Sequence, residues 1–117
     1  MVNKLDKLAP VRLLIDEDLL RRLKEWGHLI CSLDEVRIHY GDSPPLGYSA
    51  RTALLVGLED LGEETPDTLS PYEYKGAPLT LGVAMPRWFR EKLSKRAEEL
   101  NIPRAALIRL ALHRGLP

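Results

Sequence analysis

The chain has a single cysteine, Cys31, and its longest uninterrupted apolar stretch, Ala53–Leu58, is six residues long. One cysteine excludes an intramolecular disulfide and fits a reducing compartment. A helix that spans a bilayer needs about 20 apolar residues, so no membrane partner is expected. The first seven residues lack the apolar core that a secretory signal carries. Together these absences predict a cytoplasmic protein.

A surplus of charge of one sign is also missing, because 17 Lys and Arg balance 17 Asp and Glu. The charges are unevenly distributed, however. Residues 79–117 hold eight basic and three acidic groups. Residues 1–62 hold eight basic and ten acidic groups, and residues 63–78 hold one basic and four acidic groups. A basic C-terminal third attracts phosphate even when the whole chain is neutral. An ordinary solvated helix face explains the same charges, so charge alone only supports a nucleic-acid partner.

The clearest local pattern lies in the C-terminal third. Large apolar residues alternate with small or polar ones over Leu79–Met85, which predicts a strand with one buried face. Pro86 suits the first turn of a helix that follows, and Asn101 suits a left-handed cap at its C-terminal end. Pro103 then opens a second helix, which Gly115 ends. The predicted order is strand, helix, tight turn, helix.

A similar order begins near the N-terminus. Alternation over Val11–Ile15 predicts another strand, and Asp16 is well placed to cap the helix after it. Gly47–Ser49 reads as a turn with a good N-cap for a further helix, whose apolar face extends to Leu61. Between these two helices lies an insert at about 27–45, in which we expect an extension of the helix and a short strand or loop.

The sequence therefore divides into a first unit (1–62), an acidic, proline-rich linker (63–78) and a second unit (79–117). Val11–Ile15 aligns with Leu81–Met85, and Leu54 aligns with Ile108. A lone strand with two short helices cannot bury both of its faces, whereas two copies can by pairing strands and interlocking helices. We expect a mainly α fold with a short antiparallel two-stranded ribbon, made by the two strands of one chain.

Two stretches of the second unit, Leu81–Leu93 and Ala97–Arg109, resemble the ribbon-helix-helix family of Arc, MetJ and CopG. The shared pattern is an alternating strand, often a proline, an amphipathic helix, a turn, and a second helix with a Leu-Ile-Arg-like segment. In the first unit, Gly47–Thr52 is similar to the family's turn, whereas the insert departs from the pattern. The resemblance implies tandem ribbon-helix-helix units that form a single-chain pseudo-dimer.

The resemblance also implies a mechanism, in which the ribbon enters the major groove of double-stranded DNA and its outward side chains read base edges. The N-terminus of each second helix binds a backbone phosphate. Carried over, the base readers are Arg12, Leu14, Thr80, Gly82 and Ala84. The phosphate anchors are Tyr48, Ser49, Ile102, Pro103 and Arg104, and Pro103 removes one N–H from its anchor.

The expected reading face departs from the family, whose readers are usually long and polar. Only Arg12 and Thr80 offer a hydrogen bond to a base. Leu14 and Ala84 suit thymine methyl groups, and Gly82 offers no side chain. Weak or asymmetric sequence selection, or a partner other than DNA, remains open at this point.

The sequence contains no pattern typical of catalysis, and neither a cofactor nor a metal is expected. His28, His39 and His113 have no ligand-like spacing and no cysteine beside them. Cys31 lies on or near the apolar stripe of the first helix, so we expect it to be packed.

We expect a DNA-binding transcriptional repressor or autoregulator. The alternative is a protein-interaction module on the same fold, such as an antitoxin or a phage-encoded adaptor. A homodimer of pseudo-dimers is also expected on DNA. Its contact would be helix surfaces or the insert, where Val36, Ile38 and Tyr40 suggest an apolar strand edge.

Overall fold

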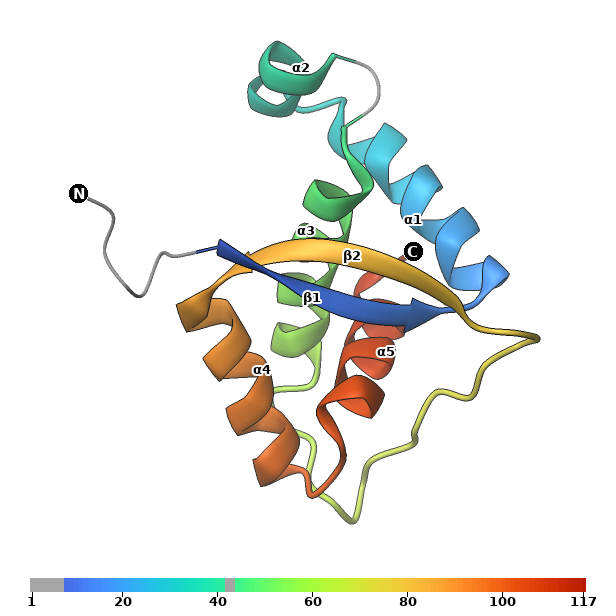
Figure 1. Cartoon of the computed structure of the whole chain (residues 1–117), viewed down its shortest axis with the longest axis vertical. Coiled ribbons are helices and arrows are strands. Elements are labelled where there is room, and N and C mark those ends of the chain that lie inside the picture. Colours follow the sequence, from blue (N-terminus) through green and yellow to red (C-terminus); the bar gives the residue numbers. More distant parts are fainter. Residues whose placement is uncertain (1–7, 42–43) are drawn as a thin grey trace.

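The computed structural model describes residues 8–41 and 44–117. Within these residues the chain forms five helices and one two-stranded antiparallel sheet, so the fold is mostly helical, as expected. The elements are β1 (Leu8–Ile15), α1 (Glu17–Ile30), α2 (Asp34–Tyr40), α3 (Leu46–Asp60), β2 (Leu79–Pro86), α4 (Arg87–Glu99) and α5 (Arg104–Gly115). Figure 1 shows the ribbon of β1 and β2 lying across α3 and α5, with α1 and α4 on opposite sides.

The expected pairing of the two strands within one chain is confirmed. β1 runs antiparallel to β2, with Val11 opposite Val83 and Arg12 opposite Gly82. Both strands are longer than the alternation predicted, since β1 begins at Leu8 and β2 ends at Pro86. The inner face of the ribbon is buried in the main core, because alternate residues of each strand point to the same side.

The centre of the core is the antiparallel crossing of α3 and α5. A Cβ atom built on Gly57 would lie 1.8 Å from the carbonyl oxygen of Ala111. A Cβ atom built on Gly115 would lie 2.0 Å from the carbonyl oxygen of Ala53. The two backbones therefore approach more closely than any side chain at these glycines would permit. This close approach packs α3 directly against α5.

Two helix ends follow the sequence expectations. Asp16 caps α1, and its carboxylate accepts a hydrogen bond from the N–H of Leu19 at 2.8 Å. Asn101 follows α4 with a φ of 57°, the left-handed conformation expected there. The N–H of Ile102 then donates to the carbonyl of Ala97, and that of Asn101 to Glu98, which closes the helix in a Schellman turn.

An arginine of α1 binds the C-terminal end of α5, and an arginine of α4 binds the C-terminal end of α3. Arg22 of α1 donates to the carbonyl of His113 at 2.8 Å and to that of Leu116 at 3.1 Å. Arg96 of α4 donates to the carbonyl of Leu61 at 2.6 Å, just beyond α3. A cation at this end of a helix satisfies unpaired carbonyls and opposes the helix dipole. These contacts bind the two halves together.

The described part of the insert forms a short helix where a short strand or loop was expected. This part completes α1 and then forms α2, so Val36, Ile38 and Tyr40 lie on a short helix instead of a strand edge. Asp34 and Glu35 occupy the first turn of α2, where negative charge favours a helix. Val36 packs in a small cluster with Cys31, which is buried as expected. Residues 42 and 43 lie outside the described part.

Residues 63–78 form no helix or strand, but their aromatic side chains dock on the folded body. The Tyr72 hydroxyl donates to the buried Asp16 carboxylate at 2.5 Å, and the Lys75 N–H donates to the same oxygen at 2.8 Å. Burial alone would raise the pKa of Asp16, but the hydrogen bonds from Lys75, Tyr72 and Leu19 together lower it below its ordinary value. Burial and the neighbouring carboxylate raise the pKa of Tyr72. This segment is therefore fixed to the start of α1.

Candidate nucleic-acid interface

The five residues predicted to read bases lie on one exposed face of the ribbon. The register places Arg12 opposite Gly82 and Leu14 opposite Thr80, and it places Ala84 opposite Pro10. All of these residues are exposed. They share a face because successive side chains of a strand point to opposite sides, and the other side is buried in the core. The alternation in the sequence thus correctly identified which residues face outward.

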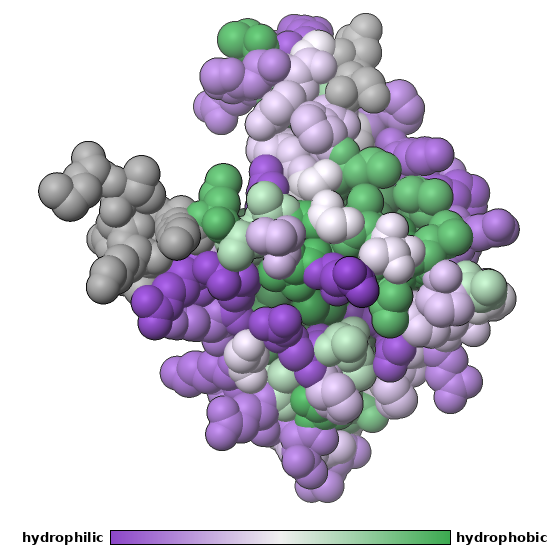
Figure 2. Space-filling view, viewed as in Figure 1, coloured by the Kyte–Doolittle hydropathy of each residue, from purple (hydrophilic) through white to green (hydrophobic). Residues whose placement is uncertain are grey.

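This outer face is largely apolar and carries one formal charge, that of Arg12. Figure 2, viewed like Figure 1, shows hydrophobic, nearly neutral and hydrophilic residues side by side over the ribbon, with a larger hydrophobic area beside it toward α1. Leu14 is 40% exposed, and Leu8 at the start of β1 is 62% exposed. The face can therefore offer apolar contacts at several positions, but a long hydrogen-bond donor at only one.

Side chains from outside the ribbon hold its two outer edges. The Tyr74 hydroxyl donates to the carbonyl of Leu14 at 2.6 Å, and Arg51 of α3 donates to the carbonyl of Ala84 at 2.8 Å. The Arg109 guanidinium lies 4.6 Å from the centre of the Tyr74 ring. Bonded carbonyls at the edges fix the ribbon against the helices beneath it. Sequence reasoning missed Tyr74 and Arg51, although the aromatic residues of the linker were a signal for Tyr74.

The N-terminus of α3 does not lie where the sequence placed it. Pro45 is the N-cap and makes no side-chain capping bond. The first hydrogen bond of the helix runs from the N–H of Ser49 to the carbonyl of Pro45. Ser49 is therefore inside the helix and buried, so its predicted role as the N-cap is wrong. The three N–H groups of Leu46, Gly47 and Tyr48 have no partner within the helix. Of the two predicted anchors here, Tyr48 belongs to this first turn and is half-buried.

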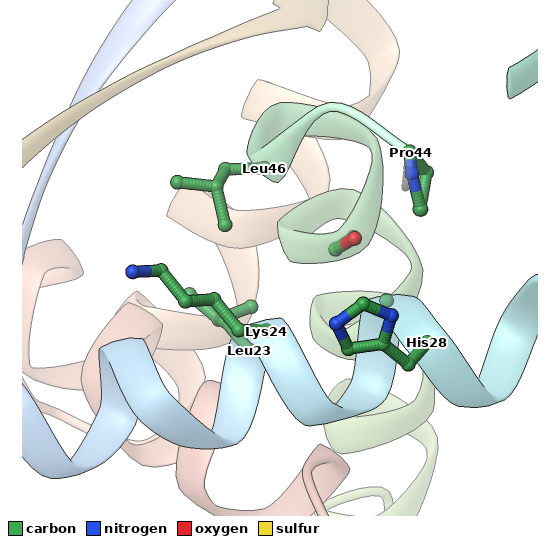
Figure 3. Close-up of a pocket in the computed structure, with 7 residues that line it drawn as sticks. Leu23, Lys24, His28, Pro44 and Leu46 are labelled. Carbon is green, nitrogen blue, oxygen red and sulfur yellow. The ribbon is translucent and has the colours of Figure 1, made fainter. Parts of the chain in front are cut away.

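A hollow of about 200 Å³ lies between this helix start and α1. Figure 3 shows the His28 ring rising from α1 toward the first turn of α3, with Pro44 beyond it. Lys24, one turn earlier on α1, lines the same hollow and, like His28, is exposed. The hollow is lined by Leu23, Lys24, Gly27, His28, Pro44, Leu46 and Ser49. Two basic side chains and an uncapped helix start thus meet on this side of the ribbon.

A corresponding hollow of about 450 Å³ lies between α4 and the start of α5, on the other side of the ribbon. Pro103 is the N-cap of α5 and makes no side-chain capping bond. Arg104 and Pro103 are exposed and Ile102 is half-buried, so the three predicted anchors surround this helix start. The hollow is lined by Arg87, Arg90, Glu91, Ser94, Lys95, Glu98 and Arg104. It is more basic than the hollow beside α3.

The part of the chain that the structure describes contains no group of three His, Cys, Asp or Glu residues able to hold a metal ion. Among the same residues, no helix has both the length and the apolar composition needed to cross a bilayer. His113 makes a structural contact, since its Nδ1 lies 2.9 Å from an Arg22 nitrogen. Burial, with the nearby charge of Arg22, lowers the pKa of His113. A neutral ring accepts this hydrogen bond from the arginine.

No protein-family model, no curated protein and no solved structure matches the chain. Its function must therefore be inferred from the ribbon and from the two helix starts that flank it.

Proposed function

We propose that the chain is a tandem ribbon-helix-helix protein that binds double-stranded DNA as a single-chain pseudo-dimer. The observation that carries this proposal is the exposed ribbon between two uncapped helix N-termini, one from each half. The repeated strand–helix–helix order supports it. The contacts also fit an approximate two-fold relation, because the aligned positions Arg12 and Gly82 are opposite each other, as are Gly57 and Ala111.

In this proposal the ribbon enters the major groove, which is about 12 Å wide and admits a two-stranded ribbon. Arg12 and Thr80 donate to base edges, while Leu14 and Ala84 contact thymine methyl groups. Outward-facing N–H groups at the starts of α3 and α5 bind a phosphate on each side, because the helix dipole favours an anion there.

Basic side chains add to the phosphate contacts proposed on each flank. Lys24 and His28 lie beside the start of α3, and Lys95 and Arg104 beside the start of α5. We therefore propose a cytoplasmic repressor or autoregulator, with two chains meeting on one site.

A second candidate is a protein-interaction module, and the apolar outer face of the ribbon favours it. Leu8 and Leu14 are exposed there, and contiguous exposed apolar patches commonly mark a protein partner. An antitoxin or a phage-encoded adaptor would use the same fold in this way.

Titrating a fluorescent random-sequence duplex with the protein at several salt concentrations tests the proposal. The logarithm of the binding constant should fall linearly with the logarithm of salt, with a slope of about −0.9 for each phosphate contact. Six contacts would give a loss of roughly 1,000-fold between 50 and 200 mM salt. Absence of binding at 50 mM salt would contradict the proposal and leave the protein-interaction role.

A further inference from the structure

The two strands have matching backbones but unlike outward side chains. At the centre of the ribbon, Arg12 lies opposite Gly82, so a long donor faces a residue with no side chain. On one side of this centre Leu14 faces Thr80, and on the other Pro10 faces Ala84. A homodimeric ribbon repeats every reader by symmetry, whereas this ribbon presents each reader once.

The two phosphate-binding flanks also differ. Lys24 and His28 supply the basic groups near α3, and among the described residues that line this hollow none is acidic. The hollow beside α5 has four basic residues and two acidic ones, and Arg87 forms an ion pair with Glu91 at 2.8 Å. Rotating the chain by half a turn on a duplex would therefore exchange unlike phosphate contacts as well as unlike readers.

We infer that the chain reads a DNA sequence without two-fold symmetry, in one orientation, with a single guanine contacted by Arg12. This inference rests on the proposed function. Arginine is the side chain that most often contacts guanine, through the O6 and N7 atoms in the major groove. The neighbouring readers Leu14 and Ala84 select thymine through its methyl group, so thymines flank the guanine. A symmetric ribbon would have a second arginine at position 82 and would contact a second guanine, but Gly82 has no side chain to make this contact.

Selection of bound duplexes from a random pool tests the inference with the full chain. The part of the wild-type motif that one chain reads should have one fixed guanine and no internal dyad. Arg12→Ala should lose preference at that guanine and bind the selected duplex roughly 10- to 100-fold more weakly. Its affinity for random duplex should change much less. An equal loss of affinity for both duplexes would mean that Arg12 contacts the phosphate backbone of DNA, and it would overturn the inference.

Gly82→Arg supplies a gain-of-function test, because a Cβ atom at Gly82 meets nothing within 4 Å. The variant places a second arginine opposite the first and should recover a motif with a second guanine on the complementary strand, related to the first by a dyad. Gly82→Ala is the matched control and should keep the wild-type motif. Circular dichroism checks that both variants fold, and the Arg12→Ala result stands independently of them.

The remaining outcomes separate the inference from the proposed function. A palindrome within the part of the motif that one wild-type chain reads, or no such palindrome for a folded Gly82→Arg variant, would overturn the inference while DNA binding stands. Recovery of no duplex at any salt concentration would overturn the proposed function itself.

Discussion

Replacing Gly57 with alanine tests the crossing of α3 and α5, on which the position of both helix starts depends. The new Cβ atom would lie 1.8 Å from the oxygen and 2.6 Å from the carbon of the Ala111 carbonyl, where ordinary contact begins at 3.4 Å. Both are backbone atoms and cannot rotate away, so the helices must separate by more than about 1 Å. A gap of this size removes roughly a quarter to a half of the dispersion energy between atoms that face each other.

The expected loss follows from two opposing terms. Overpacking of a filled core costs about 1–3 kcal/mol, and a clash with backbone belongs at the upper end. Alanine also stabilises the helix by up to about 1 kcal/mol relative to glycine, because its helix propensity is higher. We expect the free energy of unfolding to fall by about 2 kcal/mol, and Tm by about 8 °C.

Urea denaturation followed by tryptophan fluorescence measures this loss. Gly47→Ala is the matched control, because it lies in the same helix and its Cβ would make ordinary contacts at 3.7 and 3.8 Å. We expect the control to be as stable as the wild type or slightly more stable. If Gly57→Ala proved as stable as Gly47→Ala, the close crossing of α3 and α5 would be refuted.

Two further predictions concern the linker and the basic flank. Tyr72→Phe removes a hydrogen bond from the buried Asp16 carboxylate and should lower the free energy of unfolding by about 1–3 kcal/mol. The pKa of Asp16 is lower in the folded state than its ordinary value of 3.8, so the ionised carboxylate stabilises the fold above pH 3.8, and this stabilisation is lost as the pH falls through the folded-state pKa. Tyr72→Phe should therefore make the free energy of unfolding depend less steeply on pH on the acid side. An unchanged acid side of the profile would contradict this. Arg104→Ala should weaken binding on all duplexes and reduce the salt slope by about 1. Lys92→Ala, which lines a different hollow, should leave the slope unchanged, and equal slopes for both variants would argue against Arg104 as a phosphate contact.

Local patterns in the sequence were sufficient to predict the ribbon and most helix ends. Alternation over Val11–Ile15 and Leu79–Met85 gives both the strands and the side that faces outward, since each strand buries one face. Asn101 and Asp16 mark their caps correctly, because each acts on backbone groups a few residues away.

Other features depend on contacts that no local pattern contains. Ser49 has the residue type of an N-cap, but Pro45 starts the helix one turn earlier and turns the serine inward against Gly27. The period-two spacing from Val36 to Tyr40 is equally compatible with a short helix that buries one residue. Tyr72 reaches Asp16 across 56 positions of sequence, so its role appears only in the folded chain.

A duplex that carries the selected site should hold two chains. One ribbon with two hydrogen-bonding readers supplies discrimination of only a few kcal/mol, since each good base contact is worth about 1–3 kcal/mol. Specific DNA binding typically requires about 4–10 kcal/mol over non-specific binding, which a second chain on an adjacent site would provide. The insert offers the contact, because Ile38 on α2 is 79% exposed and Leu33 just before it is 59% exposed. Mass photometry on a duplex of about 40 bp, long enough for two sites one helical turn apart, measures the stoichiometry. Ile38→Lys should reduce it from two chains to one, whereas Glu35→Lys on the same helix should not, and one wild-type chain per duplex at saturation would refute the pairing.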